Sequence, residues 1–237
     1  MSALIFDIET IGEDFDQMDK TTQTSLTRWI DRSARDEKEA QKMTAEIKNG
    51  LGLSPLTGQI VALGVMDSDK STGAVYYSAN GDNDKIQEIE ERGCKLKALK
   101  EAEMLAKFWE LVEKYEYFVS FNGRGFDVPF IMMRSAVHNI RPSKDLMSNR
   151  YLSSQRFGAK HIDLMDQLGF YGASARKGNL HLFCRAFGID SPKDGVCGSE
   201  VGQLYAEGKF LDIAKYNVGD LVATNELYKH WTKYLQF

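Results

Sequence analysis

The chain opens with SALIFDIE, residues 2–9, and the first six of these predict a short buried strand because they are largely apolar and contain no turn residue. Asp7 and Glu9 stand two positions apart at the end of this strand, so their side chains point to the same face. Carboxylate oxygens are the ligands that Mg²⁺ and Mn²⁺ prefer. Open α/β sheets commonly place ligand sites at strand ends. The pair therefore indicates a metal site more strongly than acidic pairs in turn-like surroundings, such as Asp67 and Asp69.

The rest of the chain alternates strand-like and helix-like segments. Further strands are predicted at residues 59–66, 74–78, 117–121 and near 159–163, the first two paired as a hairpin. Helices are predicted at residues 102–112, from Asp127 onward, at 180–187, at 200–207 and from about 210 to 235. This order predicts an α/β fold in which a mixed sheet of about five strands is flanked by helices. Residues 1–237 are expected to form a single domain.

One segment, residues 13–50, interrupts this order between the first and second strands. It is highly charged, and residues 21–48 look helical, which predicts a helical insertion within the domain. Two interpretations stay open. The one we favour is a solvated surface helix, and the other is a lid over a substrate. The residues that would then touch nucleic acid are Arg28, Trp29, Arg32 and Arg35.

The composition is typical of a soluble globular protein. The 237 residues are enough for one sizeable core, and 43% of them are hydrophobic and 27% charged. No apolar run is long enough to span a bilayer, and the first residues lack a signal-peptide pattern. Three cysteines without a CxxC pair argue against a zinc site or a disulfide framework and favour the cytoplasm. The net charge of −4 counts against a passive DNA-binding surface, but not against a carboxylate site that binds cations.

Two later stretches place an acidic residue on a predicted helix. In FNGRGFDVPF, residues 121–130, an apolar strand runs through a glycine-containing turn to Asp127 at a helix start, where aspartate is a common N-cap. In YNVGD, residues 216–220, Tyr216 and Asp220 are four positions apart and therefore neighbours on one helix face. Each stretch is commonplace when it is taken alone, so a function is indicated only by their combination with the first strand.

The three stretches together resemble, in sequence order, the three exonuclease motifs of the DEDD superfamily of ribonuclease-H-like 3′–5′ exonucleases. The matching elements are Asp7-x-Glu9, Asn122-x-x-x-Phe126-Asp127 and Tyr216-x-x-x-Asp220. A tyrosine four positions before the last aspartate, with Lys215 where another subtype has histidine, is similar to the tyrosine subtype. The chain looks most like stand-alone proteins predicted as exonucleases from their likeness to the family-B DNA polymerase proofreading domain. Residues 54–64 and 161–166 resemble that family's second-strand and fifth-strand regions, so the similarity covers residues 3–11 and roughly 53–230.

This resemblance implies a two-metal-ion phosphodiesterase. A ribonuclease-H-like fold would hold two divalent cations, Mg²⁺ or Mn²⁺, and hydrolyse phosphodiester bonds at the 3′ end of single-stranded nucleic acid, releasing nucleoside monophosphates. Asp7 would bridge both ions, and Asp127 would hold the second of them. Glu9 and Asp220 would complete the shell of the first. Tyr216, which is protonated at neutral pH, would orient the attacking water.

The resemblance also implies contacts to the terminal nucleotide. Thr10 and Asn122 would grip it, and Phe126 would stack on a base or wedge near one, although a role for Phe126 in the apolar core is equally open. DNA is favoured over RNA only through the likeness to polymerase proofreading domains. His161 and Asp163 alternate on a predicted strand and suggest a metal pair, but we favour a structural role because four carboxylates already account for the metals.

Two alternatives use the same fold. The first is an RNA-trimming exonuclease or oligoribonuclease of the same superfamily, whose chemistry is identical and whose substrate is distinguished by contact with the 2′ hydroxyl. The second is a non-catalytic nucleic-acid-binding or adaptor module, which would require the loss of a carboxylate, yet all four are present. The sequence shows no polymerase domain and no membrane segment. Any polymerase or repair partner is therefore expected to be a separate chain.

Overall fold

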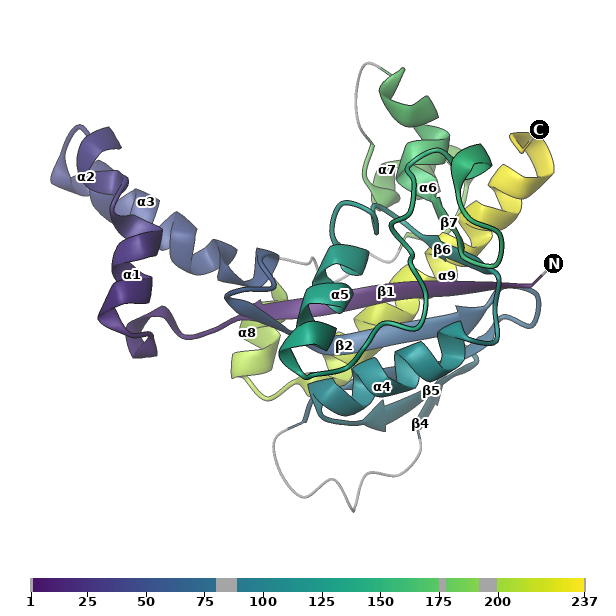
Figure 1. The fold of residues 1–237 in the computed structure, drawn as a ribbon, viewed down its shortest axis with the longest axis horizontal. Helices are drawn as coiled ribbons and strands as arrows, with labels where there is room; N and C mark the ends of the chain where they lie inside the picture. Colours follow the sequence, from purple (N-terminus) through teal and green to yellow (C-terminus); the bar gives the residue numbers. More distant parts are fainter. Residues whose placement is uncertain (1, 80–88, 175–177, 192–199, 237) are drawn as a thin grey trace.

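In the computed structural model, which describes residues 2–79, 89–174, 178–191 and 200–236, seven strands form one mixed sheet (Figure 1). The strands are β1 (Ala3–Gly12), β2 (Gly58–Asp67), β3 (Thr72–Tyr77), β4 (Ile89–Glu91), β5 (Cys94–Ala98), β6 (Tyr117–Ser120) and β7 (Lys160–Asp163). Their order across the sheet is β4-β5-β3-β2-β1-β6-β7. The pairs β1–β2, β2–β3 and β4–β5 are antiparallel, and β1–β6, β6–β7 and β3–β5 are parallel. The predicted α/β class with a mixed sheet is confirmed.

The sheet has two more strands than the sequence predicts. These are β4 and β5, which form one edge of the sheet. Along β5, buried residues alternate with Lys95 and Lys97, which are exposed. Charged side chains on outer strands discourage pairing with the edge of another sheet. The same charges obscure the strand in the sequence, because a short, highly charged stretch is also typical of a loop.

β1 is longer than predicted, which changes the place of the acidic pair. The sequence puts Asp7 and Glu9 at the end of the first strand, but β1 continues to Gly12 in antiparallel pairing with β2. Its parallel partner β6 pairs with residues 3–5 only. The two carboxylates therefore lie inside β1, just past the point where β6 ends. This is still the carboxyl edge of the parallel strands, where α/β folds place ligand sites.

Helices cover both faces of the sheet (Figure 1). They are α4 (Glu101–Val112), α5 (Asp127–Val137), α6 (Leu164–Leu168), α7 (Leu180–Phe187), α8 (Val201–Ala206) and α9 (Phe210–Tyr234), with 3-10 turns η1 (Phe15–Gln17), η2 (Leu51–Leu53), η4 (Leu152–Ser154) and η5 (Phe170–Gly172). Helices α4 and α5 pack in one core with Leu4, Phe6 and Ile8. Helix α9, with α7 and α8 beside it, packs in the other core with Ala3 and Ile5. Because side chains alternate along a strand, β1 contributes to both cores.

The insertion forms an arm that stands off the sheet. The segment predicted to be helical contains α1 (Lys20–Thr27), α2 (Ile30–Ser33) and α3 (Glu37–Gly50). Figure 1 shows these helices projecting beyond the end of β1 and away from the layers of the domain. In α1–α3 only Ile30 is buried, and the arm meets the body mainly through η2 and β1. The arm therefore contributes little to the two central cores.

Close packing of α9 on the sheet depends on Gly64. This residue of β2 pairs with Asp7 of β1, and its open side faces α9. A Cβ atom placed here would collide with Oδ1 of Asn217 and lie 2.6 Å from Cδ1 of Leu221. The missing side chain thus allows the helix to lie directly over the strand that carries Asp7.

We expect Gly64→Ala to destabilise the protein by about 1–3 kcal/mol, because an extra methyl group in a packed site forces neighbouring atoms apart. The measurement is the free energy of unfolding from urea denaturation, compared with Gly202→Ala. A Cβ atom at Gly202, in α8, would meet nothing within 4 Å, so this control should change stability by no more than about 1 kcal/mol. Equal stability of Gly64→Ala and the unsubstituted protein would contradict the close packing described here.

Candidate metal centre

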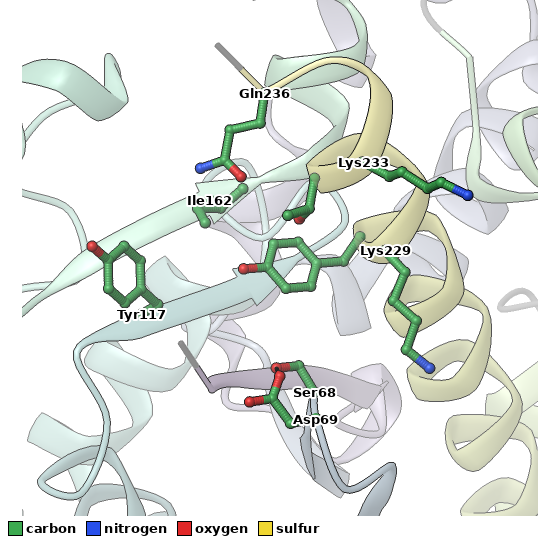
Figure 2. A pocket seen from close by; sticks show the side chains of 9 residues that line it. Ser68, Asp69, Tyr117, Ile162, Lys229, Lys233 and Gln236 are labelled. Atoms are coloured by element: carbon green, nitrogen blue, oxygen red, sulfur yellow. Dashed lines mark hydrogen bonds between the residues drawn. The ribbon is translucent and has the colours of Figure 1, made fainter.

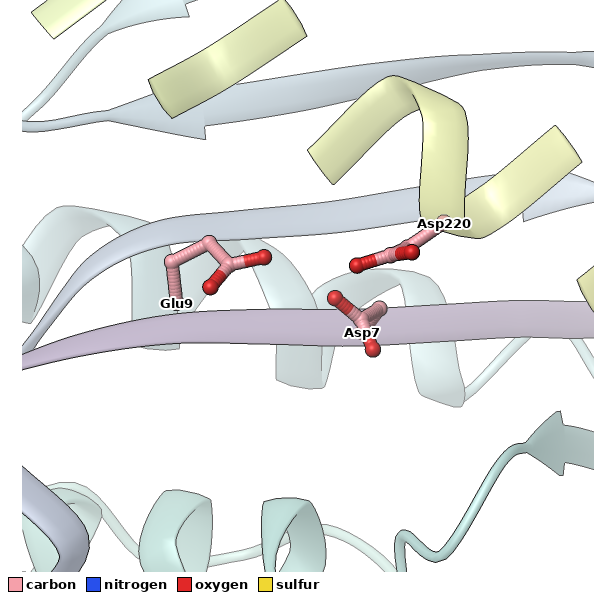
Figure 3. Close-up of side chains that lie close together, drawn as sticks. All are labelled: Asp7, Glu9 and Asp220. Atoms are coloured by element: carbon pink, nitrogen blue, oxygen red, sulfur yellow. The ribbon is translucent and has the colours of Figure 1, made fainter. Parts of the chain in front are cut away.

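Three carboxylates from two elements converge between the sheet and α9. Asp7 and Glu9 come from β1 and Asp220 from α9, and each offers one oxygen atom within 4.8 Å of the others. Figure 3 shows the strand and the helix directing these carboxylate groups toward one another. Glu9 and Asp220 are buried, and Asp7 is partly exposed. The fold thus brings together three of the four carboxylates that the sequence indicates.

Asp127, the fourth carboxylate, comes from α5, and its side chain contacts the backbone of β1. Its Oδ1 accepts a hydrogen bond from the backbone N–H of Ile8, with 3.1 Å between the two atoms. Ile8 stands beyond the residues of β1 that pair with β6, so Asp127 satisfies a strand donor that β6 no longer reaches. Asp127 is the first residue of α5 and Phe126 occupies the N-cap position. The common role of aspartate as a helix N-cap therefore does not apply to Asp127, because its carboxylate turns toward β1 instead.

Burial and mutual repulsion raise the pKa values of these carboxyl groups. Burial is the largest cause for both Asp7 and Glu9, and it holds each pKa well above its ordinary value. The charges of Asp127 and Asp220 raise the same two pKa values further. Burial also raises the pKa of Asp127 to about 7.

Basic side chains do not neutralise this negative charge within the described part of the chain. No lysine, arginine or histidine there forms an ion pair with Asp7, Glu9 or Asp127. Charges taken out of water are stable only when they are paired or bound to a metal. Because all the clustered donors are carboxylate oxygens, the site suits hard divalent cations such as Mg²⁺ and Mn²⁺.

Asn217 connects α9 to the acidic strand. Its Nδ2 donates a hydrogen bond to Oδ2 of Asp7 over 2.8 Å, and a further hydrogen bond to Glu9 lowers the pKa of that carboxyl group. Asn217 is fully buried, and its Oδ1 has no hydrogen-bond partner among the residues that the structure describes. Asn217 is not among the site residues predicted from the sequence. The signal was available, because residues 217 and 220 are three positions apart and so share a helix face.

The phenol of Tyr216 lies beside the same cluster. It donates a hydrogen bond to Asp220. Partial burial, followed by the negative charges of Asp220, Glu9 and Asp7, raises the pKa of Tyr216 far above its ordinary value. The phenol is therefore protonated at neutral pH and acts as a hydrogen-bond donor.

Asp163 fixes the turn that leads from β6 into α5. Its two carboxylate oxygens accept hydrogen bonds from the backbone N–H groups of Asn122 and Arg124, both over 2.9 Å. Asn122 has a φ of 63°, a left-handed conformation that asparagine tolerates better than most residues. Hydrogen bonds to Asp163 of β7 thus fix the turn before α5. This turn determines where α5 begins and therefore where Asp127 lies. Asp163 serves the backbone and does not join the clustered carboxylates.

His161 likewise has a structural role. Its Nε2 accepts from the hydroxyl of Ser120 over 2.7 Å, and its Nδ1 donates to the carbonyl of Leu146 over 3.2 Å. Burial lowers the pKa of His161 to about 3, so the ring is neutral, with the proton on Nδ1. Both ring nitrogens are occupied by the protein and neither faces a metal.

The three residues expected to contact a nucleotide are neighbours of the carboxylates in the chain. Thr10 follows Glu9 in β1, and its hydroxyl donates to the carbonyl of Gly52 over 2.7 Å, which ties β1 to η2. Phe126 precedes Asp127 and is partly buried, and its ring lies 5.5 Å from that of Phe130. Asn122 lies in the turn between β6 and α5. Their contacts with a nucleotide stay a prediction.

A separate cavity of about 540 Å³ lies at the C-terminal end of α9 (Figure 2). Its walls include Ser68 after β2, Tyr117 at the start of β6, and Lys229 and Lys233 in the last turns of α9. None of the four candidate carboxylates lines it. It is therefore distinct from the metal centre.

Comparisons with known proteins are consistent with this arrangement. Residues 68–236 match a family described as predicted 3′–5′ exonucleases related to the exonuclease domain of PolB. The matched range contains Asp127, Tyr216 and Asp220, whereas Asp7 and Glu9 precede it. An uncharacterized protein of Methanocaldococcus jannaschii is 31% identical over 188 residues, which cover 75% of this chain and 88% of the relative.

Two further similarities are to parts of much longer proteins. DNA polymerase 1 of Sulfolobus acidocaldarius is 27% identical over 133 residues, which cover 54% of this chain and 15% of the polymerase. The structure of the family B DNA polymerase from Pyrobaculum calidifontis matches 98% of this chain and 24% of that chain, with a TM-score of 0.59 at 16% identity. The polymerase structure thus shows the fold, which is ribonuclease-H-like. In the described residues, no helix is both long and apolar enough for a membrane span.

We expect Mn²⁺ to raise the melting temperature, and to raise it more as the pH increases through about 7. Below that pH Asp127 keeps its proton, and the raised pKa values of Asp7 and Glu9 also favour protons on these ligands, so metal must compete with them. In chelator the same groups stabilise the fold at low pH and lose this contribution as the pH rises through their folded pKa values. Mn²⁺ at a hundred times its Kd should add about 2.7 kcal/mol, or roughly 5–10 °C.

The measurement is thermal unfolding with Mn²⁺ or chelator at pH 5.5 and pH 8. Comparing the two solutions at one pH cancels the titration of groups outside the site. Asp7→Asn should lose the Mn²⁺ effect, and Asp69→Asn, in an exposed turn, should keep it. An equal Mn²⁺ effect in both variants would contradict a metal centre at Asp7.

Proposed function

Because the chain belongs to the family of predicted 3′–5′ exonucleases related to the exonuclease domain of PolB, we propose that it hydrolyses phosphodiester bonds at the 3′ end of single-stranded nucleic acid. The products are nucleoside monophosphates, and DNA is the favoured substrate. The observation that carries this proposal is the cluster of Asp7, Glu9 and Asp220 within 4.8 Å. Likeness to parts of two DNA polymerases supports the preference for DNA.

The four carboxylates are proposed to hold two divalent cations, Mg²⁺ or Mn²⁺. Two observations support this assignment: no basic side chain in the described residues forms an ion pair with Asp7, Glu9 or Asp127, and the clustered donors are all oxygens. Asp7 would be the central ligand, Glu9 and Asp220 would hold a cation together with it, and Asp127 would supply the remaining carboxylate. When bound, such cations lower the pKa of water and neutralise charge on the reacting phosphate and its leaving oxygen.

The chain's own side chains then position the reactants. The protonated phenol of Tyr216 donates to Asp220, and its oxygen can accept a hydrogen bond from the attacking water and so orient it. Asn217 holds the carboxylate of Asp7 by a direct hydrogen bond, which fixes the ligand before substrate arrives. Preorganised groups of this kind accelerate a reaction because little reorganisation is needed when it occurs.

The terminal nucleotide is proposed to lie against Thr10, Asn122 and Phe126. Thr10 and Asn122 offer polar groups to the sugar and phosphate, and the Phe126 ring offers a surface for stacking on a base. Thr10 donates its proton to Gly52, so its hydroxyl oxygen remains able to accept a hydrogen bond from a sugar hydroxyl.

We expect the protein to shorten end-labelled single-stranded DNA from its 3′ end with Mg²⁺ or Mn²⁺, and to stop in chelator. Asp7→Asn should lower the rate at least about 1000-fold, since cations at such a site contribute several kcal/mol to catalysis. Asp69→Asn should keep full activity. Single-stranded DNA, duplex DNA and RNA are compared side by side on a gel. Faster loss of RNA would favour the RNA-trimming alternative, and full activity of Asp7→Asn would overturn the assignment.

Tyr216→Phe should lower kcat by about 10- to 100-fold, which is less than the loss of a metal ligand, because the phenol positions water and does not abstract its proton. The pH dependence of kcat should keep its shape, and Mn²⁺ should still raise the melting temperature. Tyr228→Phe, on the same helix but beside the distant cavity, is the matched control and should be fully active. If Tyr216→Phe is as inactive as Asp7→Asn, orienting the attacking water is not sufficient to describe the role of Tyr216.

A further inference from the structure

We propose that the tip of the helical arm is a second contact for nucleic acid and binds the strand several nucleotides upstream of the 3′ end. The tip is the surface of Arg28, Trp29, Arg32 and Arg35. The proposal rests on the proposed exonuclease function for the identity of the bound strand. It assigns a task to a segment that neither the carboxylate centre nor the central cores require.

The helices of the arm are not held in place by the central cores, because Ile30 is the single buried residue of α1–α3. Local contacts hold the helices instead. Asp19 and Asp36 accept hydrogen bonds from backbone N–H groups at the starts of α1 and α3, which satisfies donors that helix ends leave open. Nζ of Lys48 lies 2.8 Å from a carboxylate oxygen of Asp16, which links α3 to η1. The arm thus presents its tip on an ordered support.

The cations of the tip lack acidic partners among the described residues. Arg28, Arg32 and Arg35 are exposed, and none of them takes part in an ion pair there. Elsewhere in the arm, Lys42 and Lys48 are each paired with a carboxylate. In a chain of net charge −4, unpaired guanidinium groups at one place create a local site for a polyanion.

Trp29 adds an aromatic surface to these charges. Its side chain is 46% exposed, which is unusual for so large an apolar ring. The indole Nε1 donates to the carbonyl of Leu26 over 2.9 Å, and this fixes the ring. A hollow of about 440 Å³ is lined by Arg28, Trp29, Arg32 and Ser33. Exposed aromatic rings with adjacent arginines are the combination that single-strand-binding proteins use to stack bases and hold phosphates.

The place of the arm suits a strand whose end lies at the carboxylates. β1 ends at Gly12, three residues past Glu9, and the chain then enters the arm. Helix α3 has 14 residues and is therefore about 20 Å long. Residues 9–12 of β1 add about 10 Å to this path. A stacked strand rises about 3.4 Å per nucleotide, so the tip would meet it about six to nine nucleotides from the end. Figure 1 shows the arm continuing outward from the end of β1 that lies beyond the acidic pair.

A second protein molecule is the competing occupant of this surface, and the composition of the tip disfavours it. Between residues 13 and 50, Trp29 is the single large hydrophobic residue with a strongly exposed side chain. Stable protein interfaces have an apolar centre depleted of charge. Arg28 and Arg32, which line one hollow together with the Trp29 ring, suit a polyanion better. A second copy of the chain bound at this surface is therefore an outcome that the test must be able to detect.

The test measures binding of a fluorescent single-stranded DNA of 20 nucleotides by anisotropy, in chelator so that no hydrolysis occurs. Arg28→Ala with Arg32→Ala should weaken binding of the 20-mer at least about tenfold and lower the slope of log K against log salt by about 1.4, at roughly 0.7 for each phosphate that an arginine no longer neutralises. Trp29→Ala should weaken it about tenfold and Trp29→Phe much less. With Mn²⁺ present, all variants should hydrolyse a 4-mer at the same rate, because a strand of that length with its 3′ end at the carboxylates does not reach the tip.

The matched control removes the same charge from the body of the protein, by Lys97→Ala with Arg141→Ala, and should change binding of the 20-mer less than twofold. Unchanged binding by the arm variants, or an equal loss in the control, would overturn the proposal. A halved molecular mass of the arm variants in solution would also overturn it, since the tip would then be a contact between copies. Cleavage of DNA by the unsubstituted protein is scored separately. If it cleaves nothing, the exonuclease proposal fails, and the anisotropy result still decides the role of the arm.

Discussion

Repulsion among carboxylates held in one place is the constraint on which this structure depends. Asp7, Glu9 and Asp220 lie within 4.8 Å of one another, although separated groups in water would avoid such proximity. They stay together because β1 and α9 are packed by large apolar contacts on either side of them. The hydrophobic cores thus stabilise a local arrangement that is unfavourable until cations or protons neutralise it. Burial is the largest cause of the raised pKa values of Asp7 and Glu9, and this repulsion raises them further.

Residues without any role in chemistry set the geometry of this arrangement. Gly64 leaves room for α9 to lie against the strand pair, and Asn217 occupies that room and donates to Asp7. On the other side of the sheet, Asp163 fixes the turn before α5, which delivers Asp127 to the backbone of β1. The positions of the carboxylates therefore depend on the close approach of α9 to the sheet and on hydrogen bonds from residues that are not themselves ligands.

The sequence predicts the features that local chemistry dictates and misses those that depend on which elements meet. The first strand, the order of helices and strands, and the acidic positions follow from hydrophobic pattern and spacing. Strand β5 is missed because its exposed lysines suit a sheet edge but also suit a loop. The extent of β1 is missed because antiparallel pairing with β2, rather than its own sequence, carries it to Gly12. Gly64 acquires its role only from the approach of α9 to β2, which no local pattern encodes.

The overall charge of the chain decides what kind of nucleic-acid contact is possible. With a net charge of −4, the surface as a whole repels a polyanion, and binding is confined to places where cations are held or arginines stand unpaired. On the proposed assignments these places are the carboxylate centre and the tip of the arm, with the end of β1 and helix α3 between them. Two weak contacts joined by one strand reinforce each other only when the strand can span both. An internal segment of a long strand could bind the tip, but it would make no second contact at the carboxylate centre, which accepts only a free end. Selectivity for a single-stranded end therefore follows from the spacing of two sites on an otherwise repulsive surface, without any contact that reads the sequence of bases.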